Sequence, residues 1–240
     1  MRGIIQNNEQ IANDIFSMTI YQPEVAQMAE IGQFVNIYTR DKSTLLPRPI
    51  SISEINETTI TIVYAVVGQG TAEFATYNEG EKIEISTPQG NGFQVQDVKT
   101  SVLVGGGVGV PPLVELAKQI KGNKIVVLGF RDEPFLVDKF EQLGATVYVA
   151  TDSGKHGFKG NVLELIKKEG IVGDYYYSCG PKPMLRALAS EFKDNLQVSM
   201  EERMGCGYGA CVGCVCKTKD GLKKVCTDGP VFNGGDVQWT

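Results

Sequence analysis

The sequence of 240 residues is about 1.6 times as long as a typical domain, so it predicts one large or two ordinary domains. Hydrophobic residues make up 42% of it and charged residues 21%, which excludes a disordered chain, and the net charge of −5 provides no basic surface for nucleic acid. No apolar run reaches the roughly 18 residues that span a bilayer, and residues 1–10 lack a signal-peptide core, so we expect a cytoplasmic protein that does not bind membranes. The single histidine, His156, lies in a glycine-flanked loop, which argues against a Rieske cluster, a catalytic zinc site and a Ser-His-Asp triad.

Residues 1–97 are expected to form a β-rich domain. Stretches that alternate in polarity or are rich in β-branched residues cover 14–21, 33–38, 49–55, 58–67 and 82–86. Polar or glycine-containing turns separate them, which predicts an antiparallel barrel or sandwich. One short helix is predicted over 71–77.

In residues 98–200 the apolar residues follow a different pattern along the chain. Strands that are apolar throughout are predicted at 101–105, 124–130, 145–151, 174–180 and 196–200. Helices are predicted between them at 111–122, 134–144, 161–170 and 181–194. This alternation predicts an α/β domain whose parallel sheet is covered on both faces and binds ligands at the carboxyl ends of its strands.

Residues 201–240 are expected to form a small metal-binding subdomain. Cys206, Cys211 and Cys214 have the spacing C-x4-C-x2-C, and Cys226 follows after eleven residues, which is typical of a plant-type [2Fe-2S] site. The glycines of this loop would let backbone N–H groups point at the cluster sulfides. The alternative is a structural zinc site with four cysteines, although such sites usually contain two C-x2-C pairs.

Cys216 and Cys226 compete for the fourth place at the cluster. Cys216 lies two residues after Cys214, so an extended chain would point both side chains the same way, whereas the two irons need two thiolates each. Cys226 follows residues 217–224, whose pattern predicts a hairpin that returns the chain to the loop. We therefore expect Cys226 to be the ligand and Cys216 to be a buried thiol outside the cluster.

Two motifs in the β-rich domain fit a flavin. The tetrapeptide RPIS begins a strand with Arg48, whose guanidinium can pair with a diphosphate, and ends at Ser51, whose hydroxyl can supply a further hydrogen bond. Residues 68–71, GQGT, follow a strand and open a helix, whose N-terminus favours an anion. Each motif also has an ordinary structural reading, as an Arg-Pro at a barrel rim and as a helix capped by Thr71. Their occurrence together, before the cysteine cluster, favours the flavin.

A glycine-rich turn opens the α/β domain and predicts a phosphate cradle for a nicotinamide dinucleotide. Its glycines are Gly105, Gly106, Gly107 and Gly109. Val110 occupies the place of the third glycine in G-x-G-x-x-G, so a standard Rossmann site is not predicted.

Two further positions lie where the strands of such a sheet bind ligands. Cys179, Gly180 and Pro181 end the fourth parallel strand, although a lone cysteine is more often a small buried apolar residue. Asp152 ends the third strand, where a carboxylate can accept a hydrogen bond from the adenosine ribose and repel a 2′-phosphate. The alternative for Asp152 is a solvated loop residue.

In this order, RPIS, GQGT, GGGVG and CGP resemble the ferredoxin–NADP reductase superfamily, in which a flavin barrel precedes a nicotinamide-binding α/β domain. Residues 201–232 and 151–162 resemble the electron transfer subunits of NAD-dependent (class B) dihydroorotate dehydrogenase, and this resemblance runs through the whole chain. It implies that FAD is lined by Arg48, Pro49, Ile50, Ser51, Val63, Tyr64, Ala65, Gly70 and Thr71. It also implies that the cluster is bound by Cys206, Cys211, Cys214 and Cys226. Relatives commonly have a basic residue in the place of Ala65.

The resemblance implies that electrons run from an FMN-containing dihydroorotate dehydrogenase catalytic subunit through the cluster and FAD to NAD+, in pyrimidine synthesis. It also implies a heterotetramer with two copies of each subunit. The sequence contains no second flavin barrel and no obvious substrate base, so no catalytic residue for the organic substrate is assigned to this chain. Two alternatives are a flavin and iron–sulfur NAD(P)H reductase subunit of a hydrogenase or ferredoxin-linked transhydrogenase, and a zinc-stabilised binding module without enzymatic activity.

Overall fold

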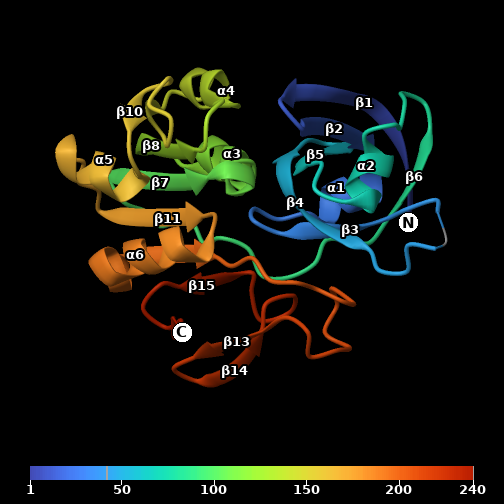
Figure 1. Cartoon of the computed structure of the whole chain (residues 1–240). Helices are drawn as coiled ribbons and strands as arrows, with labels where there is room; N and C mark the ends of the chain where they lie inside the picture. Colours follow the sequence, from blue (N-terminus) through green and yellow to red (C-terminus); the bar gives the residue numbers. More distant parts are fainter. Residues whose placement is uncertain (42, 240) are drawn as a thin grey trace.

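Two sheets and a small C-terminal subdomain make up the fold of the computed structural model, which describes residues 1–41 and 43–239. The barrel and the α/β domain lie side by side, and the C-terminal segment runs beneath both of them (Figure 1). The predicted fold class is confirmed in its main parts. Among the described residues, no helix combines the length and the hydropathy that a membrane span requires.

The N-terminal sheet closes into an antiparallel barrel with the strand order β1-β2-β5-β4-β3-β6. Its strands are β1 Arg2–Ala12, β2 Ile15–Tyr21, β3 Phe34–Tyr38, β4 Arg48–Ile55, β5 Thr59–Ala65 and β6 Lys82–Ile85. Two short helices accompany them, α1 Pro23–Met28 and α2 Gln69–Phe74. Inward-facing isoleucines, valines and aromatic rings from these strands and helices form a core of their own, because alternate residues of each strand point to the interior.

Strand β1 and helix α1 were not predicted from the sequence. Most of β1 is exposed or half-buried, and its polar run from Gln6 to Gln10 masks the alternation on which the prediction depends. Register shifts between Ile5 and Asn7 and between Gln10 and Ala12 interrupt the period further. Backbone pairing with β2 and β6, rather than buried side chains, therefore holds most of this strand in the barrel.

The second sheet has the strand order β10-β9-β8-β7-β11-β12-β15. Its strands are β7 Thr100–Gly106, β8 Asn123–Phe130, β9 Thr146–Thr151, β10 Phe158–Lys159, β11 Tyr175–Cys179, β12 Leu196–Ser199 and β15 Val231–Asn233. The helices are α3 Pro112–Gln119, α4 Val137–Gln142, α5 Val162–Lys168 and α6 Lys182–Phe192. Short 3-10 turns cover η1 Gly107–Gly109 and η2 Lys193–Asn195.

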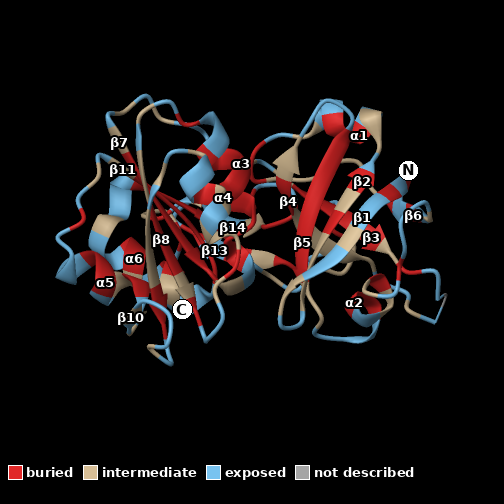
Figure 2. Cartoon of the chain, turned by 90° about the horizontal axis from the view of Figure 1, so that it is seen from above, coloured by how far each residue is buried: buried red, intermediate tan, exposed pale blue. Residues whose placement is uncertain are grey.

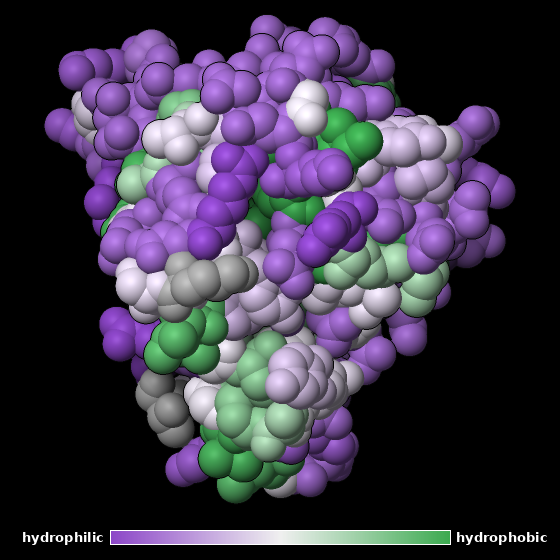
Figure 3. Space-filling model, turned by 90° about the vertical axis from the view of Figure 1, so that its right-hand side faces the viewer, coloured by the Kyte–Doolittle hydropathy of each residue, from purple (hydrophilic) through white to green (hydrophobic). Residues whose placement is uncertain are grey.

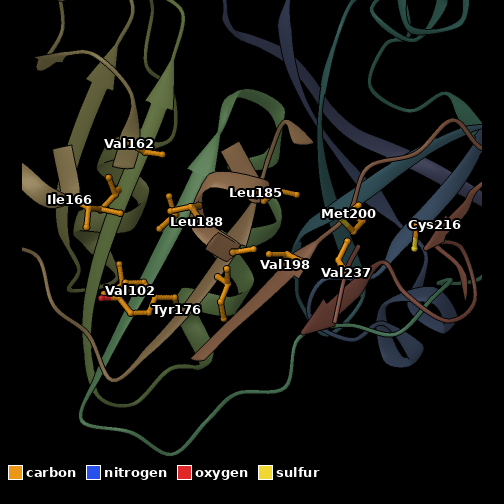
Figure 4. Packing of buried hydrophobic residues seen from close by; sticks show 14 of the residues in the cluster. Val102, Val162, Ile166, Tyr176, Leu185, Leu188, Val198, Met200, Cys216 and Val237 are labelled. Carbon is orange, nitrogen blue, oxygen red and sulfur yellow. The ribbon is translucent and has the colours of Figure 1, made fainter. Parts of the chain in front are cut away.

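Both faces of this sheet are buried, as its continuous apolar strands predict. Along β7, Leu103 packs into the core beneath α3 and α4, whereas Val102 and Val104 pack into the core beneath α5 and α6. Buried residues accordingly concentrate along the central strands (Figure 2). The core beneath α5 and α6 extends toward the C-terminal subdomain, where Figure 4 shows Met200, Val237 and Cys216.

The C-terminal subdomain is tied into the α/β sheet. Strands β13 Val215–Thr218 and β14 Gly221–Lys224 form the hairpin predicted for residues 217–224. The chain then adds β15 to the sheet, antiparallel to β12, with Phe232 opposite Val198. This last strand was not predicted, because three residues carry no readable period.

Buried contacts fix the barrel against the α/β domain. The carboxylate of Glu115 in α3 is 3% exposed and accepts a hydrogen bond of 2.9 Å from the backbone N–H of Ile55 at the end of β4. Lys118 donates to the carbonyl of Ile55 over 2.8 Å, and the hydroxyl of Ser53 donates to the carbonyl of Pro111 over 3.1 Å. The end of β4 is therefore held on α3 by the buried groups of Glu115 and Ser53 and, at the surface, by Lys118.

Candidate functional site

A cleft of about 340 Å³ lies between the barrel and the α/β domain, and we call it the interdomain cleft. It brings together residues that are far apart in the sequence, because β4 and β5 form one wall and the ends of β7, β11 and β12 form the other. The predicted cofactor residues that line it are Arg48, Pro49, Ile50, Ser51, Val63, Tyr64, Ala65, Thr71, Gly109, Cys179 and Gly180. Met204 and Pro230 of the C-terminal segment complete it.

Arg48 is placed by contacts on both sides of its guanidinium. Nη1 donates to the carbonyl of Leu46, and the guanidinium packs directly over Gly70, where a Cβ would collide with it. Glycine at position 70 therefore lets the cation lie flat against the start of α2. No ion pair is formed by Arg48 among the described residues, so its charge is available to an anion in the interdomain cleft.

Thr71 takes part in a helix cap and lines the interdomain cleft. Its hydroxyl accepts from the N–H groups of Val67 and Gly68 and donates to the carbonyl of Gly68. The N-cap of α2 is Gly68, and Thr71 is its third residue, so the N-cap position predicted for Thr71 is wrong although its side chain takes part in the cap. Its side chain holds the β5–α2 turn, and the same turn places Val67 at the cleft.

A second cleft of about 840 Å³ follows the carboxyl ends of β7, β8 and β9, and we call it the strand-end cleft. Gly106, Gly107, Asp152 and Pro181 line it, as a nicotinamide site at this edge of the sheet predicts. Val67, Val108 and Glu201 line both clefts, so the two are neighbours without an intervening layer.

Two predicted cofactor residues lie outside both clefts. Gly105 is the sixth residue of β7, and a Cβ there would meet Val110 and Leu113 beneath α3. Gly70 lies beneath Arg48, as described above. Both glycines permit close packing behind the clefts, and the contacts predicted between them and a cofactor remain predictions.

Cys179 is a buried thiol at the edge of the interdomain cleft. Burial raises its pKa to about 12, and a hydrogen bond with the side chain of Ser199 opposes this shift only in part. The thiol is therefore neutral at physiological pH. It belongs to no group of metal-ligating side chains among the described residues, and it lines the cleft.

The four predicted metal ligands meet as two pairs. The N–H of Cys211 is directed at the sulfur of Cys206. Burial raises the pKa of Cys226, and the thiol of Cys214 is close enough to raise it further, as Cys206 also does. Within residues 1–41 and 43–239, no three His, Cys, Asp or Glu side chains enclose a point for a single metal ion. Two adjoining thiol pairs match the needs of a [2Fe-2S] cluster, in which each iron takes two thiolates.

Backbone N–H groups in the cysteine loop, residues 205–214, face the sulfur of Cys206. A hydrogen bond from the N–H of Tyr208 is the largest cause that lowers the pKa of Cys206, to about 6, and the N–H groups of Cys211 and Ala210 add to it. The N–H of Cys211 lies 3.4 Å from this sulfur. Burial instead raises the pKa of Cys226 to about 11, so this thiolate needs a metal ion to replace its proton.

Cys216 lies apart from these two pairs. It is the second residue of β13 and lines a different cavity, together with Lys182, Met200 and Trp239. Burial raises the pKa of its thiol. The hairpin therefore separates Cys216 from the loop and brings Cys226 to it.

The cysteine loop is attached to the barrel and to its own hairpin. The side-chain amide of Asn36 in β3 donates to the carbonyl of Cys206 over 3.3 Å, and Nζ of Lys224 donates to the carbonyl of Gly209 over 2.6 Å. Gly207 and Gly209 have φ angles of +75° and +88°, which only glycine adopts readily. The sequence predicted a role for the glycines of this loop, but it contained no signal that Asn36 contacts the loop.

Comparison with known proteins agrees with this geometry. Residues 201–238 match the family model described as the iron-sulfur cluster binding domain of dihydroorotate dehydrogenase B. The chain is 46% identical to the dihydroorotate dehydrogenase B (NAD(+)) electron transfer subunit of Fusobacterium nucleatum and 45% identical to that of Bacillus cereus. Each alignment covers 98% of this chain and 96% of the relative. This chain belongs to the family of dihydroorotate dehydrogenase B electron transfer subunits.

Solved structures show the same fold beyond this family. The structure of an NADH-dependent reduced ferredoxin–NADP oxidoreductase, described in terms of flavin-based electron bifurcation, has a TM-score of 0.89 and 31% identity, over 99% of this chain and 90% of that one. Phthalate dioxygenase reductase has a TM-score of 0.66 at 18% identity, over 91% and 86% of the two chains, and shows the fold alone.

Membership of the electron transfer subunit family confirms the predicted resemblance and the predicted cofactors, which are FAD, a [2Fe-2S] cluster and NAD. The zinc-stabilised binding module is thereby excluded as the function of this chain. The residues that hold each cofactor, and the limits of the three predicted domains, remain predictions.

Proposed function

We propose that this electron transfer subunit takes electrons one at a time at its cysteine loop and delivers them in pairs to NAD+ at the strand-end cleft. The observation that carries this proposal is the arrangement of the three sites in series. The interdomain cleft shares Val67, Val108 and Glu201 with the strand-end cleft and is bounded by Met204 and Pro230 of the C-terminal subdomain. A flavin between the other two sites can accept single electrons on one side and give a hydride on the other.

The interdomain cleft is proposed to hold FAD. Arg48 would pair with the diphosphate, and Ser51 would offer a hydroxyl on the same strand. Val63 and the buried Tyr64 give the cleft an apolar floor, while Ala65 offers only a methyl group where relatives commonly carry a cation. The flavin therefore depends on Arg48 for most of its charge neutralisation in the barrel.

The strand-end cleft is proposed to hold NAD(H). Gly107 leaves the backbone open to a dinucleotide at the end of β7, since a Cβ there would meet no heavy atom within 4 Å, whereas Gly106 allows Met184 and Pro181 to pack against the strand end. Asp152 lies at the far end of the same cleft and is exposed. A carboxylate there accepts hydrogen bonds from ribose hydroxyls and repels a 2′-phosphate.

The cysteine loop is proposed to hold the [2Fe-2S] cluster through Cys206, Cys211, Cys214 and Cys226. This assignment is supported by the two adjoining thiol pairs and by the N–H groups directed at Cys206. When bound, the cluster supplies one-electron transfer. The chain's own residues keep the four thiols at the required places and shield Cys214 and Cys226 from solvent.

The partner is proposed to be the FMN-containing dihydroorotate dehydrogenase catalytic subunit, in a cytoplasmic heterotetramer with two copies of each chain. Tyr208, Val212 and Leu222 are large apolar residues of the C-terminal subdomain that remain exposed. In Figure 3, apolar residues gather at the lower end of the face, where this subdomain lies. An apolar surface around the cysteine loop suits a protein partner that must approach the cluster closely.

A second candidate function has one observation in its favour. The high structural similarity to the NADH-dependent reduced ferredoxin–NADP oxidoreductase fits a reductase subunit whose partner handles ferredoxin. The two candidates differ in the partner rather than in the three sites of this chain. Identification of the protein that co-purifies with the chain from its own cells distinguishes them.

Replacement of Arg48 by Ala is expected to weaken FAD binding by about 2 kcal/mol, roughly thirtyfold, because a charge-assisted contact with the diphosphate is lost. The dissociation constant can be measured by flavin fluorescence after removal and readdition of FAD. Arg40→Ala, which removes another barrel arginine that pairs with Glu81, is the control and should leave FAD affinity unchanged. Full retention of FAD by Arg48→Ala would remove Arg48 from the site.

Serine in place of Cys226 is expected to abolish or strongly disturb the cluster, whereas Cys216→Ser should leave it intact, because Cys216 lies in β13 away from the thiol pairs. Iron analysis and low-temperature electron paramagnetic resonance of the reduced protein measure both effects. The reverse pattern, with the cluster lost in Cys216→Ser and kept in Cys226→Ser, would exchange the two assignments.

NADH is expected to reduce the bound flavin faster than NADPH does, and Asp152→Asn should narrow that ratio by about tenfold, because the repulsion of a 2′-phosphate is removed. Stopped-flow flavin reduction with each nucleotide gives the ratio. Asp132→Asn is the control and should leave this ratio unchanged. The Asp132 carboxylate lines the same cleft but is bonded to Ser153 and Lys155. Equal rates with NADH and NADPH in the unaltered protein would contradict the proposal.

The purified chain alone is expected to reduce artificial electron acceptors with NADH and to form no orotate from dihydroorotate, because the dihydroorotate site is proposed to lie on the partner subunit. Addition of the FMN-containing subunit should allow dihydroorotate to reduce NAD+. Absorbance at the NADH band and chromatographic measurement of orotate follow the two reactions. Orotate formation by the single subunit would contradict the proposal that dihydroorotate is oxidised on the partner subunit.

A further inference from the structure

Asn36 is a fully buried polar residue at the boundary between the barrel and the C-terminal subdomain. Its exposed fraction is 1%, and it lies in β3 directly opposite Pro49 of β4. Pro49 lines the interdomain cleft. The cysteine loop runs beneath this part of the barrel (Figure 1). Asn36 contacts the loop from β3, which pairs with β4, a strand that lines the interdomain cleft.

The side-chain amide of Asn36 is directed at the first cysteine of the loop. Nδ2 lies 3.3 Å from the carbonyl oxygen of Cys206, and because a carbonyl can only accept, the amide must present its N–H here. The next residue, Gly207, lies so close that a Cβ would collide with the amide. The loop is therefore fitted against this side chain at two consecutive residues.

The other end of the amide has no partner. Oδ1 of Asn36 is buried and makes no hydrogen bond with the described residues. A buried, unpaired carbonyl oxygen lowers stability, so an apolar side chain of similar size would suit the fold better than asparagine does. The feature that asparagine supplies and such a side chain lacks is the N–H directed at Cys206.

We propose that Asn36 is a positioning residue that fixes the Cys206 end of the cysteine loop on the flavin barrel and raises the reduction potential of the cluster. This inference rests on the proposed role of Cys206 as a ligand. Reduction adds negative charge to the cluster, and an N–H donated to the carbonyl of a ligand places the positive end of a dipole beside that charge. The reduced state therefore gains more from Asn36 than the oxidised state does.

The position of Asn36 also gives the loop a short connection to the flavin strand. One hydrogen bond joins Cys206 to Asn36, and β3 is paired with β4 at Pro49. The backbone N–H of Asn36 is held separately by Oγ of Ser86, over 2.9 Å. Ser86 has no hydrogen bond with the loop among the described residues, since its hydroxyl donates to the carbonyl of Thr87.

Two variants separate the loss of the N–H from a change in packing. Asn36→Leu removes the donor and keeps the volume, whereas Asn36→Ser removes the donor from reach and leaves space. Ser86→Ala is the control, because it removes a hydrogen bond from the same residue without touching the loop. Each variant is purified as the holoprotein, and iron, FAD, the electron paramagnetic resonance spectrum and the cluster midpoint potential are measured.

Both Asn36 variants are expected to lower the midpoint potential, by a threefold to tenfold change in the reduction equilibrium, which is about 30–60 mV at 59 mV per tenfold for one electron. The electron paramagnetic resonance spectrum of the reduced cluster should shift with it. Ser86→Ala should keep the potential of the unaltered protein. Loss of the cluster from both Asn36 variants with FAD retained would also support the proposal, since the loop would then fail to form without its anchor.

An unchanged potential in Asn36→Leu and Asn36→Ser would overturn the proposal, as would a shift confined to one of them, because packing alone would then explain it. Simultaneous loss of FAD and the cluster would overturn it too, since it would indicate general damage to the barrel. The role of Cys206 is tested separately by Cys206→Ser. Retention of an unaltered cluster there would refute the ligand assignment, whatever the Asn36 variants show.

Discussion

The buried carboxylate of Glu115 fixes the relation between the barrel and the α/β domain, and the interdomain cleft depends on that relation. It accepts the N–H of Ile55 at the end of β4, the strand that begins with Arg48. A change in the angle between the domains would move this strand away from Cys179 and Gly109 on the opposite wall. The polar contacts between β4 and α3 therefore determine whether the two walls form one cleft.

The order of the three sites follows from the way the C-terminal subdomain returns to the rest of the chain. Strand β15 joins the α/β sheet, and the carbonyl of Gly229 accepts the N–H of Asn91 just beyond the barrel. The segment between β12 and β15 therefore has both ends fixed beside the interdomain cleft. Its cysteine loop lies against β3, where Asn36 contacts it, so the topology brings the loop to the barrel.

The two kinds of site differ in how much of their structure exists before the cofactor binds. The clefts are lined by strands and turns that pack for reasons of their own, as Gly105 and Thr71 show. The cysteine loop is instead held by a few polar contacts and by paired thiols, and burial raises the pKa of Cys226 to about 11. A metal ion that binds a buried thiol has to displace its proton.

The sequence alone determined the fold class and the cofactors and predicted several of the residues that line the clefts, because these depend on local signals. Alternation, apolar runs, the RPIS and CGP motifs and the C-x4-C-x2-C spacing are readable within about twenty residues. Only the tertiary structure decided that β1 and β15 are strands, that Gly70 and Gly105 lie behind the clefts, and that Asn36 contacts Cys206. These features depend on contacts between different elements, which join residues as far as 170 positions apart at Asn36 and Cys206, and a single sequence contains no periodic signal for them. An asparagine in an ordinary strand looks the same whether it faces solvent or a metal-binding loop.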